Sequence, residues 1–316
     1  MAWPPSTRCS TGSPAPLDHP LPAWLDRPLR KLAPILVAAA LLAGCTIPKP
    51  PGDAPLRYRD VVFGGVTKTA DVHYGTAPDL QGNPVDLKFD FYQPTGDTVK
   101  RRPVVIWVHG GGFSAGDKSD GTDWATAFAR RGFVAVSLGY RLLATGPCGG
   151  TGPVPQQCYT AAYGAQHDAQ AAVRFLRKNA SFLGVDPDRI AMAGESAGAV
   201  TSLLVGWRPD DPGTSGNPGP PSDIRAAVSV AGGLPSSDYI SAGDAPALFF
   251  HGTADPTVPY SWATGNVSAM AQRNLIVGIE PFNGEGHGIL GPHRDLIHEQ
   301  ASYFLYFTMD LAQAAR

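Results

Sequence analysis

Gly194-Glu195-Ser196-Ala197-Gly198 follows the apolar run 190–193 and precedes the small-residue, helix-compatible stretch 199–205. A serine hydroxyl is a poor nucleophile unless a base can take its proton, and a tight strand-to-helix turn lifts the Oγ clear of a sheet. Such a turn is crowded, which explains the glycines two positions before and after Ser196. The alternative is an ordinary strand–turn–helix with an idle serine. The turn-forming residues 186–188 ahead of the strand favour a nucleophile elbow.

Strand and helix patterns alternate along the rest of the chain. Short opening strands are expected at 61–66, 71–74 and 85–92, and apolar runs predict inner strands at 104–108, 133–138, 190–193, 226–230, 247–250 and 276–279. Helices are expected at 124–130, 166–179, 199–205 and 293–311. This alternation predicts an α/β fold with a mostly parallel twisted sheet and helices on both faces. We find no internal repeat and no segment long enough for a large cap domain.

The length and charge of the chain limit the classes of function that it can have. The 316 residues, 43% of them hydrophobic, are ample for one large α/β domain. The formal net charge of −2 gives no reason to expect a basic face, so nucleic acid is not an expected partner. The spacing of the cysteines and the lack of clustered histidines argue against a metal site.

The N-terminal residues have the pattern of an export signal. A positive cluster at 27–31 precedes the apolar run 32–43, which is too short for a spanning helix and suits a signal peptide. The run ends in Leu42-Ala43-Gly44-Cys45, which resembles the bacterial lipobox, whose cysteine is lipidated and becomes the new N-terminus. We therefore expect an exported lipoprotein anchored to a membrane through Cys45, in the periplasm or at the cell surface. A plain secretory leader, giving a secreted protein, is the alternative.

The chain divides into three parts on this basis. Residues 1–45 are the predicted leader, 46–59 form a Pro/Gly-rich linker, and 60–316 form the catalytic domain. Beyond the leader, Cys148 and Cys158 remain as a pair. They bracket a Gly/Pro-rich stretch that a disulfide would hold in place in an oxidising compartment, with two free thiols as the alternative.

A nucleophilic serine needs a base and an acid, and in parallel sheets such groups collect at the carboxyl ends of the strands. His287 lies between glycines just after the last expected strand, and Asp255 lies just after the strand 247–250. We predict His287 as the base and Asp255 as the acid that orients it. His293 and His298 come later, on an expected helix, and are predicted to be surface residues. The rival acids are Glu280 and Glu285.

The oxyanion of an acyl-transfer reaction needs hydrogen-bond donors. Gly110-Gly111-Gly112 follows the buried strand 104–108, and bare glycine backbone can bring its N–H groups close to a substrate oxygen. The N–H of Ala197 would complete the oxyanion hole. His109 is predicted to brace this glycine loop. Each of these four signals follows its own strand: the glycine triplet, the serine, the aspartate and the histidine. A chance occurrence of this arrangement is improbable.

These motifs together resemble the α/β-hydrolase superfamily, and within it the carboxylesterases and lipases with a His-Gly-Gly-Gly oxyanion loop. Further details are similar to the bacterial feruloyl and acetylxylan esterase-like (BD-FAE-like) branch; they lie at 74–75, 90–94, 116–118, 140–142, 167–168, 172–176, 255–256 and 258–260. The resemblance implies Ser196 as nucleophile, Asp255 and His287 as its partners, and Gly111, Gly112 and Ala197 as oxyanion donors. Two features depart from the family's pattern. One is the long loop between Cys148 and Cys158, and the other is Glu195.

The resemblance implies hydrolysis of short-chain or aromatic acyl esters through an acyl-enzyme, with no cofactor. The expected ester is either a small molecule or attached to a polysaccharide. Phe113, Tyr140 and Trp262 are candidates for the wall of an acyl pocket, with ordinary core packing as the alternative. Two other functions stay open at this point: a serine peptidase of the prolyl-oligopeptidase type, and a catalytically inactive hydrolase domain that serves as a binding module.

Overall fold

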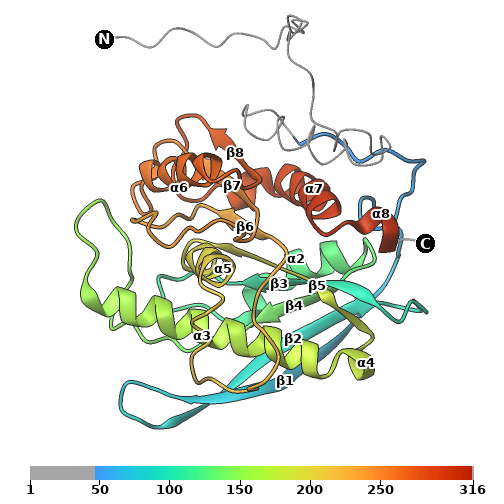
Figure 1. Cartoon of the computed structure of the whole chain (residues 1–316), viewed down its shortest axis with the longest axis horizontal. Helices are drawn as coiled ribbons and strands as arrows, with labels where there is room; N and C mark the ends of the chain where they lie inside the picture. The colour runs from blue at the N-terminus through green and yellow to red at the C-terminus, as the bar shows by residue number, and fades with distance from the viewer. Residues whose placement is uncertain (1–46, 315–316) are drawn as a thin grey trace, which may run out of the picture.

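The structure is a computed structural model that describes residues 47–314 (Figure 1). The predicted leader, 1–45, and the lipidation site at Cys45 lie outside the described residues. Among the described residues, no helix is both long and apolar enough to span a lipid bilayer.

One eight-stranded sheet forms the centre of the domain, with the strand order β1-β2-β4-β3-β5-β6-β7-β8. β2 runs antiparallel to its neighbours β1 and β4, while β3 to β8 are parallel to one another. The strands are β1 Val66–Pro78, β2 Pro84–Pro94, β3 Arg102–Val108, β4 Val134–Leu138, β5 Val185–Glu195, β6 Ala227–Val230, β7 Ala247–Gly252 and β8 Val277–Phe282. The predicted α/β class and mostly parallel sheet are confirmed.

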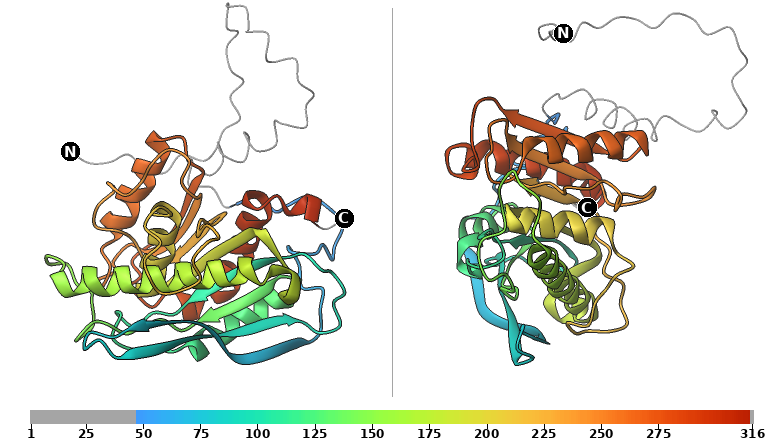
Figure 2. Two further views of the ribbon diagram at one scale, coloured as in Figure 1. Left: turned by 60° about the horizontal axis from the view of Figure 1, so that its bottom comes forward. Right: turned by 90° about the vertical axis from the view of Figure 1, so that its left-hand side faces the viewer.

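Helices cover both faces of this sheet (Figures 1 and 2). They are the 3-10 helix η2 Lys118–Gly121 and the α-helices α2 Thr122–Ala129, α3 Gln156–Lys178, α4 Ala180–Leu183, α5 Ala197–Trp207, α6 Tyr260–Gln272, α7 Leu290–Thr308 and α8 Leu311–Ala314. Alternate residues of the buried strand β3 point to opposite faces. Val104 and Ile106 join the apolar core that α3 and α5 cover, whereas Val105 and Trp107 join the core that α2 and α7 cover.

Helices α6 and α3 and strand β1 differ from the sequence prediction. Helix α6 was not expected, because its buried positions are Ala263, Asn266, Ala269 and Met270, three of them small or polar, so its apolar periodicity is weak. Helix α3 begins ten residues before the predicted start at 166, again on buried residues that are mostly alanine. The two opening strands expected at 61–66 and 71–74 are replaced by one strand, β1, whose register shifts after Thr69.

The stretch predicted to be a linker packs against the domain where the structure describes it. Ile47 is buried, and its N–H donates to Oε1 of Gln300 in α7 at 2.8 Å. Tyr58 is also buried and donates its N–H to the Arg131 carbonyl at 2.7 Å. Ile47 and Tyr58 thus hold the two ends of residues 47–59 against the domain, whereas residues 51–55 between them are exposed.

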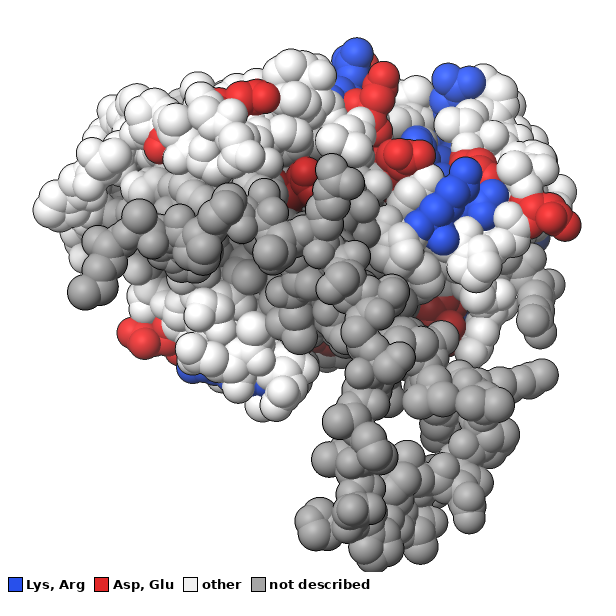
Figure 3. Space-filling view, turned by 90° about the horizontal axis from the view of Figure 1, so that it is seen from above, with Lys and Arg blue, Asp and Glu red and all other residues white. Residues whose placement is uncertain are grey.

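Charged side chains on the outside are mixed in sign. Figure 3 shows acidic and basic groups side by side on the described part of one face, with uncharged side chains over much of the rest. The Arg294–Asp123 pair between α7 and α2 is an exposed example, with an N–O distance of 2.7 Å. Exposed pairs of this kind contribute little to stability because water screens them.

The ion pair between Arg141 and Asp168 is buried. Arg141, just after β4, donates from Nε and Nη2 to both carboxylate oxygens of Asp168 in α3, at 2.7–3.0 Å. Asp168 also accepts the backbone N–H of Arg141 at 2.9 Å and is fully buried. This pair fixes the chain leaving β4, and thereby the start of the loop that carries Cys148, to the long helix α3.

Replacing Asp168 with alanine is expected to lower the free energy of unfolding by about 3–5 kcal/mol, because it leaves the Arg141 guanidinium buried without its counter-ion. Urea denaturation measures this loss. The control is Arg294→Ala, which breaks the exposed pair and should cost less than about 1 kcal/mol. Equal small losses in both variants would contradict a structural role for the buried pair.

Candidate active site

Ser196 lies at a sharp turn between β5 and α5. Its φ of 54° and ψ of −117° are sparsely populated for a residue with a side chain, and its N–H donates to the Val230 carbonyl at 2.9 Å. A Cβ on Gly198 would clash with the carbonyl of Val108 in β3, and one on Gly194 would clash with the backbone of Gly198. The two flanking glycines are therefore required by close backbone contact, as the sequence predicted.

The structure brings Ser196, His287 and Asp255 together. His287 Nε2 lies 2.8 Å from Ser196 Oγ, and His287 Nδ1 lies 2.7 Å from Asp255 Oδ2. Each residue follows a different parallel strand, β5, β8 and β7 in turn, so all three meet at the carboxyl edge of the sheet. With Nδ1 protonated and facing Asp255, Nε2 is free to accept the serine proton.

Asp255 is held as a carboxylate by its surroundings. Burial by itself would raise its pKa, but hydrogen bonds from His251, His287 and the backbone N–H groups of Val258 and Thr257 outweigh burial, so the pKa lies well below its usual range. The two backbone donors bind Oδ1 at 2.8 and 3.0 Å, which leaves Oδ2 for the histidines. The carboxylate stays ionised in weak acid and can stabilise an imidazolium.

His251 is a second histidine that contacts the acid. It is fully buried, and its Nε2 lies 2.9 Å from the Val258 carbonyl and 3.3 Å from Asp255 Oδ2. It therefore ties the acid to the loop that follows it. The sequence signal for a contact with the acid was the position of His251, four residues before Asp255 and at the end of an apolar strand.

The rival acids and bases lie outside this group. Glu285 pairs with His293 at 2.7 Å, and His293 stacks on Phe282. His298 was predicted to be a surface residue, but it is buried against Trp124, and burial lowers its pKa to about 4. The surface prediction for His298 is wrong because α7 packs this side of the helix onto α2.

The predicted oxyanion donors border Ser196. Gly111 and Gly112 have φ values of 101° and 58°, and Ala197 is the first residue of α5. Within residues 47–314 the N–H groups of these three residues donate no hydrogen bond. A Cβ on Gly111 would clash with the Ala115 carbonyl, so the conformation of this loop needs glycine. Three N–H groups, one of them at a helix N-terminus, are thus left for a developing negative charge.

A buried tyrosine supports the glycine loop through hydrogen bonds and ring stacking. The Tyr140 hydroxyl donates to the carbonyls of His109 and Gly110, at 3.0 and 3.3 Å, and its ring stacks on the His109 imidazole at 4.3 Å. His109 Nδ1 in turn donates to the Gly110 carbonyl at 2.8 Å. His109 thus braces the loop as predicted, and Tyr140 belongs to the core rather than to a pocket wall.

Cys148 and Cys158 form the predicted disulfide, with Cα atoms 5.6 Å apart. The loop that it closes contacts two parts of the site. The N–H of Cys148 donates to the Gly112 carbonyl at 3.0 Å, and the N–H of Gly150 donates to the Thr257 carbonyl at 2.7 Å. The loop therefore joins the oxyanion loop to the loop that carries Asp255.

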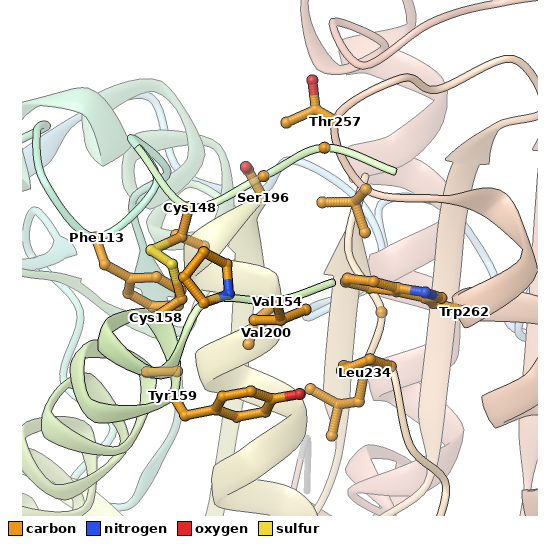
Figure 4. A pocket seen from close by; sticks show the side chains of 18 of the residues that line it. Phe113, Cys148, Val154, Cys158, Tyr159, Ser196, Val200, Leu234, Thr257 and Trp262 are labelled. Atoms are coloured by element: carbon orange, nitrogen blue, oxygen red, sulfur yellow. A yellow bond between two sulfur atoms is a disulfide. The ribbon is translucent and has the colours of Figure 1, made fainter. Parts of the chain in front are cut away.

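Two hollows meet at Ser196. One is a cavity of about 180 Å³ between the disulfide loop and helices α3, α5 and α6; in Figure 4 the disulfide lies on one side of it and Trp262 on the other. Phe113 also lines it, so two of the three predicted wall residues do so. The other hollow is an open cleft of about 870 Å³ that borders the glycine loop, Glu195 and His287.

The sheet order and this serine–histidine–aspartate site together define an α/β hydrolase. The chain belongs to the α/β-hydrolase superfamily, and residues 89–230 match the model of the BD-FAE family.

Comparisons with individual proteins agree with this placement. The chain is 35% identical over 147 residues to esterase LipI of Mycobacterium tuberculosis, an alignment that covers 46% of this chain and 39% of LipI. It is 38% identical over 121 residues to carboxylesterase NlhH of the same species, covering 38% of this chain and 32% of NlhH. The chain thus spans less than half the length of these curated relatives.

A solved structure matches this chain over a larger share of its length. Esterase 2 of Thermogutta terrifontis, solved with butyrate bound, has a TM-score of 0.60 and 26% sequence identity, and the match covers 70% of this chain and 89% of that one. The same esterase has been solved phosphonylated by sarin. Among the described residues of the present chain, no group of three or more His, Cys, Asp or Glu side chains is placed to hold a metal ion.

Removing the disulfide with Cys148→Ser/Cys158→Ser is expected to slow phosphonylation of Ser196 by about tenfold, since the oxyanion loop loses its brace but keeps its donors; deleting one donor typically costs about 100- to 1,000-fold. The rate of labelling by a fluorophosphonate, followed by intact-protein mass spectrometry, measures the change. Ser196→Ala is the blank, and a thermal melt verifies that the double variant is folded. An unchanged labelling rate in the folded double variant would contradict the brace.

Proposed function

We propose that this chain is a serine carboxylic-ester hydrolase that acts through an acyl-enzyme on short-chain or aromatic acyl esters. The observation that carries the proposal is the hydrogen-bonded series Ser196–His287–Asp255, with three unpaired N–H groups beside the serine oxygen among the described residues. The family match and the named esterases among the relatives support the same chemistry.

Acylation follows from the geometry. Ser196 Oγ attacks the ester carbonyl carbon while His287 Nε2 takes its proton, and Asp255 stabilises the imidazolium. The N–H groups of Gly111, Gly112 and Ala197 receive the negative charge on the former carbonyl oxygen. His287 then gives its proton to the leaving alcohol as the C–O bond breaks, which leaves the acyl group on Ser196.

Deacylation repeats these steps with water. His287 takes a proton from a water molecule that attacks the acyl-enzyme, and the same N–H groups hold the second oxyanion. Collapse returns the proton to Ser196 and releases the acid. The cycle needs a neutral imidazole at its start and no cofactor.

The two other candidate functions are less well supported. A prolyl-oligopeptidase-type enzyme usually carries an additional domain that restricts its substrates, and the described residues form one α/β unit. A binding module would not need the full set of nucleophile, base, acid and donors that the site retains. We therefore place the esterase first.

The deciding experiment is hydrolysis of p-nitrophenyl esters from acetyl to palmitoyl, with methyl ferulate beside them. Ser196→Ala should abolish hydrolysis. Asp255→Asn should lower kcat by about 1,000- to 10,000-fold, because an amide stabilises the wrong imidazole tautomer and no imidazolium.

Both variants leave the size of the side chain nearly unchanged, so circular dichroism should match the wild type. If the wild-type protein and Ser196→Ala are equally inert on every ester, the esterase proposal is overturned. Hydrolysis of proline-containing peptides that Ser196→Ala abolishes would then favour the peptidase.

We also propose that the domain is held at a membrane through a lipid on Cys45, in the periplasm or at the cell surface. The support is the lipobox-like sequence 42–45 and the disulfide, which suits an oxidising compartment. Cys45 is two residues before Ile47, which is bound to α7, so the lipid would keep the domain close to the bilayer.

Cys45→Ser is expected to abolish incorporation of radiolabelled palmitate in a bacterial host and to move the protein from the membrane fraction to the soluble one. Immunoblots of the two fractions provide the measurement, and Cys9→Ser is the matched control that should leave both results unchanged. Undiminished labelling of Cys45→Ser would refute the lipid anchor.

A further inference from the structure

The smaller cavity follows one side of helix α5 away from the nucleophile. Ser196, Val200 and Leu204 all line it, at intervals of four residues. Residues four apart lie above one another on a helix, and eight residues rise about 12 Å. The cavity is thus a channel that begins at the reacting serine and runs along α5 towards its C-terminal end.

Two tyrosines close the far end of this channel. The hydroxyls of Tyr163 in α3 and Tyr239, in the loop after β6, lie 2.9 Å apart, and both residues line the cavity. The guanidinium carbon of Arg208, one helical turn beyond Leu204, lies 4.6 and 5.1 Å from the centres of their rings. This contact places the tyrosine pair at the end remote from Ser196.

The end wall is held in place and carries little free charge. Arg208 Nη2 donates to Asp211 Oδ2 at 2.6 Å, so the cation behind the rings has its own counter-ion. Stacking of the guanidinium on both rings further fixes the tyrosines. An apolar chain that enters from Ser196 therefore meets two immobilised aromatic rings.

The position of His287 shows which half of an ester enters this channel. His287 must give its proton to the leaving alcohol oxygen, so the alcohol lies on the side of the imidazole. His287 borders the wide cleft but not the channel, which contacts Ser196 and Ala197 instead. The acyl group thus occupies the channel, and the alcohol occupies the wide cleft.

We propose that the Tyr163–Tyr239 pair is the end wall of the acyl channel and sets the longest acid that the enzyme accepts; this inference rests on the proposed esterase function. An apolar protein cavity of about 150 Å³ binds benzene, so a cavity of about 180 Å³ accommodates a group of about the size of a phenyl ring. The substrate class is esters of acids about the size of hexanoic or benzoic acid. The open cleft accepts alcohols of widely different size.

The test compares kcat/KM along the p-nitrophenyl ester series in the wild type, Tyr239→Ala and Tyr239→Phe. Opening the wall should raise the ratio of kcat/KM for dodecanoate to that for butyrate by at least about tenfold, since one methylene in an apolar pocket is worth that much or more. Tyr239→Phe keeps the ring and loses only the hydroxyl, so it should keep the wild-type ratio. A folded Tyr239→Ala with the wild-type ratio would overturn the proposal.

Val200→Phe gives a second test in the opposite direction. Val200 lines the channel one turn from Ser196, and a phenyl ring there should shift the preferred acid towards acetate. If Tyr239→Ala does not fold, a chain-length profile unchanged by Val200→Phe overturns the proposal on its own.

A series of hexanoate esters with methyl, phenyl and naphthyl alcohols tests the orientation. Neither Tyr239→Ala nor Val200→Phe should change the preference among these alcohols. A changed alcohol preference with an unchanged acyl profile would assign the channel to the alcohol and refute the proposal. Failure of the esterase proposal itself looks different: the wild type would then hydrolyse no ester in a Ser196-dependent way.

Discussion

The contact between Gly198 and the Val108 carbonyl is the constraint on which the rest of the site depends. A side chain at that position would push α5 away from β3, and Ser196 could not then hold its strained backbone at the end of β5. The same close approach brings the glycine loop, which continues directly from Val108, beside the first N–H of α5. Nucleophile and oxyanion donors are therefore positioned by one backbone contact, and the adjacent parallel strands deliver the acid and the base to the same edge of the sheet.

Loops that emerge from separate strands still need to be held relative to one another, and the disulfide-closed loop does this. It bonds to the oxyanion loop at Gly112 and to the acid's loop at Thr257, and it also forms a wall of the channel that we assign to the acyl group. Positioning and substrate size thus depend on the same segment. A change in its length would alter both the rate and the choice of acid, whereas changes around the wide cleft would leave the acyl channel intact.

The fold class and the three side chains that meet at the sheet edge could be predicted because both depend on local signals. Apolar runs mark buried strands, and Ser196, Asp255 and His287 each follow such a run directly. The sequence did not predict α6, whose inner side is mostly alanine and asparagine, and it placed His298 on the surface because nothing in the local sequence reveals that α2 covers it. The end wall of the channel could not be predicted from the sequence, since Tyr163, Tyr239 and Arg208 come from three elements that only the tertiary packing brings together.

The Cys148–Cys158 bond has a consequence for the cell that makes the protein. Cytosolic thiols are kept reduced, so the link that connects the oxyanion loop to α3 would stay open in that compartment. If the domain is exported as we propose, the bond would form only in the oxidising compartment. The full hydrolytic capacity of the domain would then arise outside the cytosol, and the esters of the producing cell would be spared during synthesis.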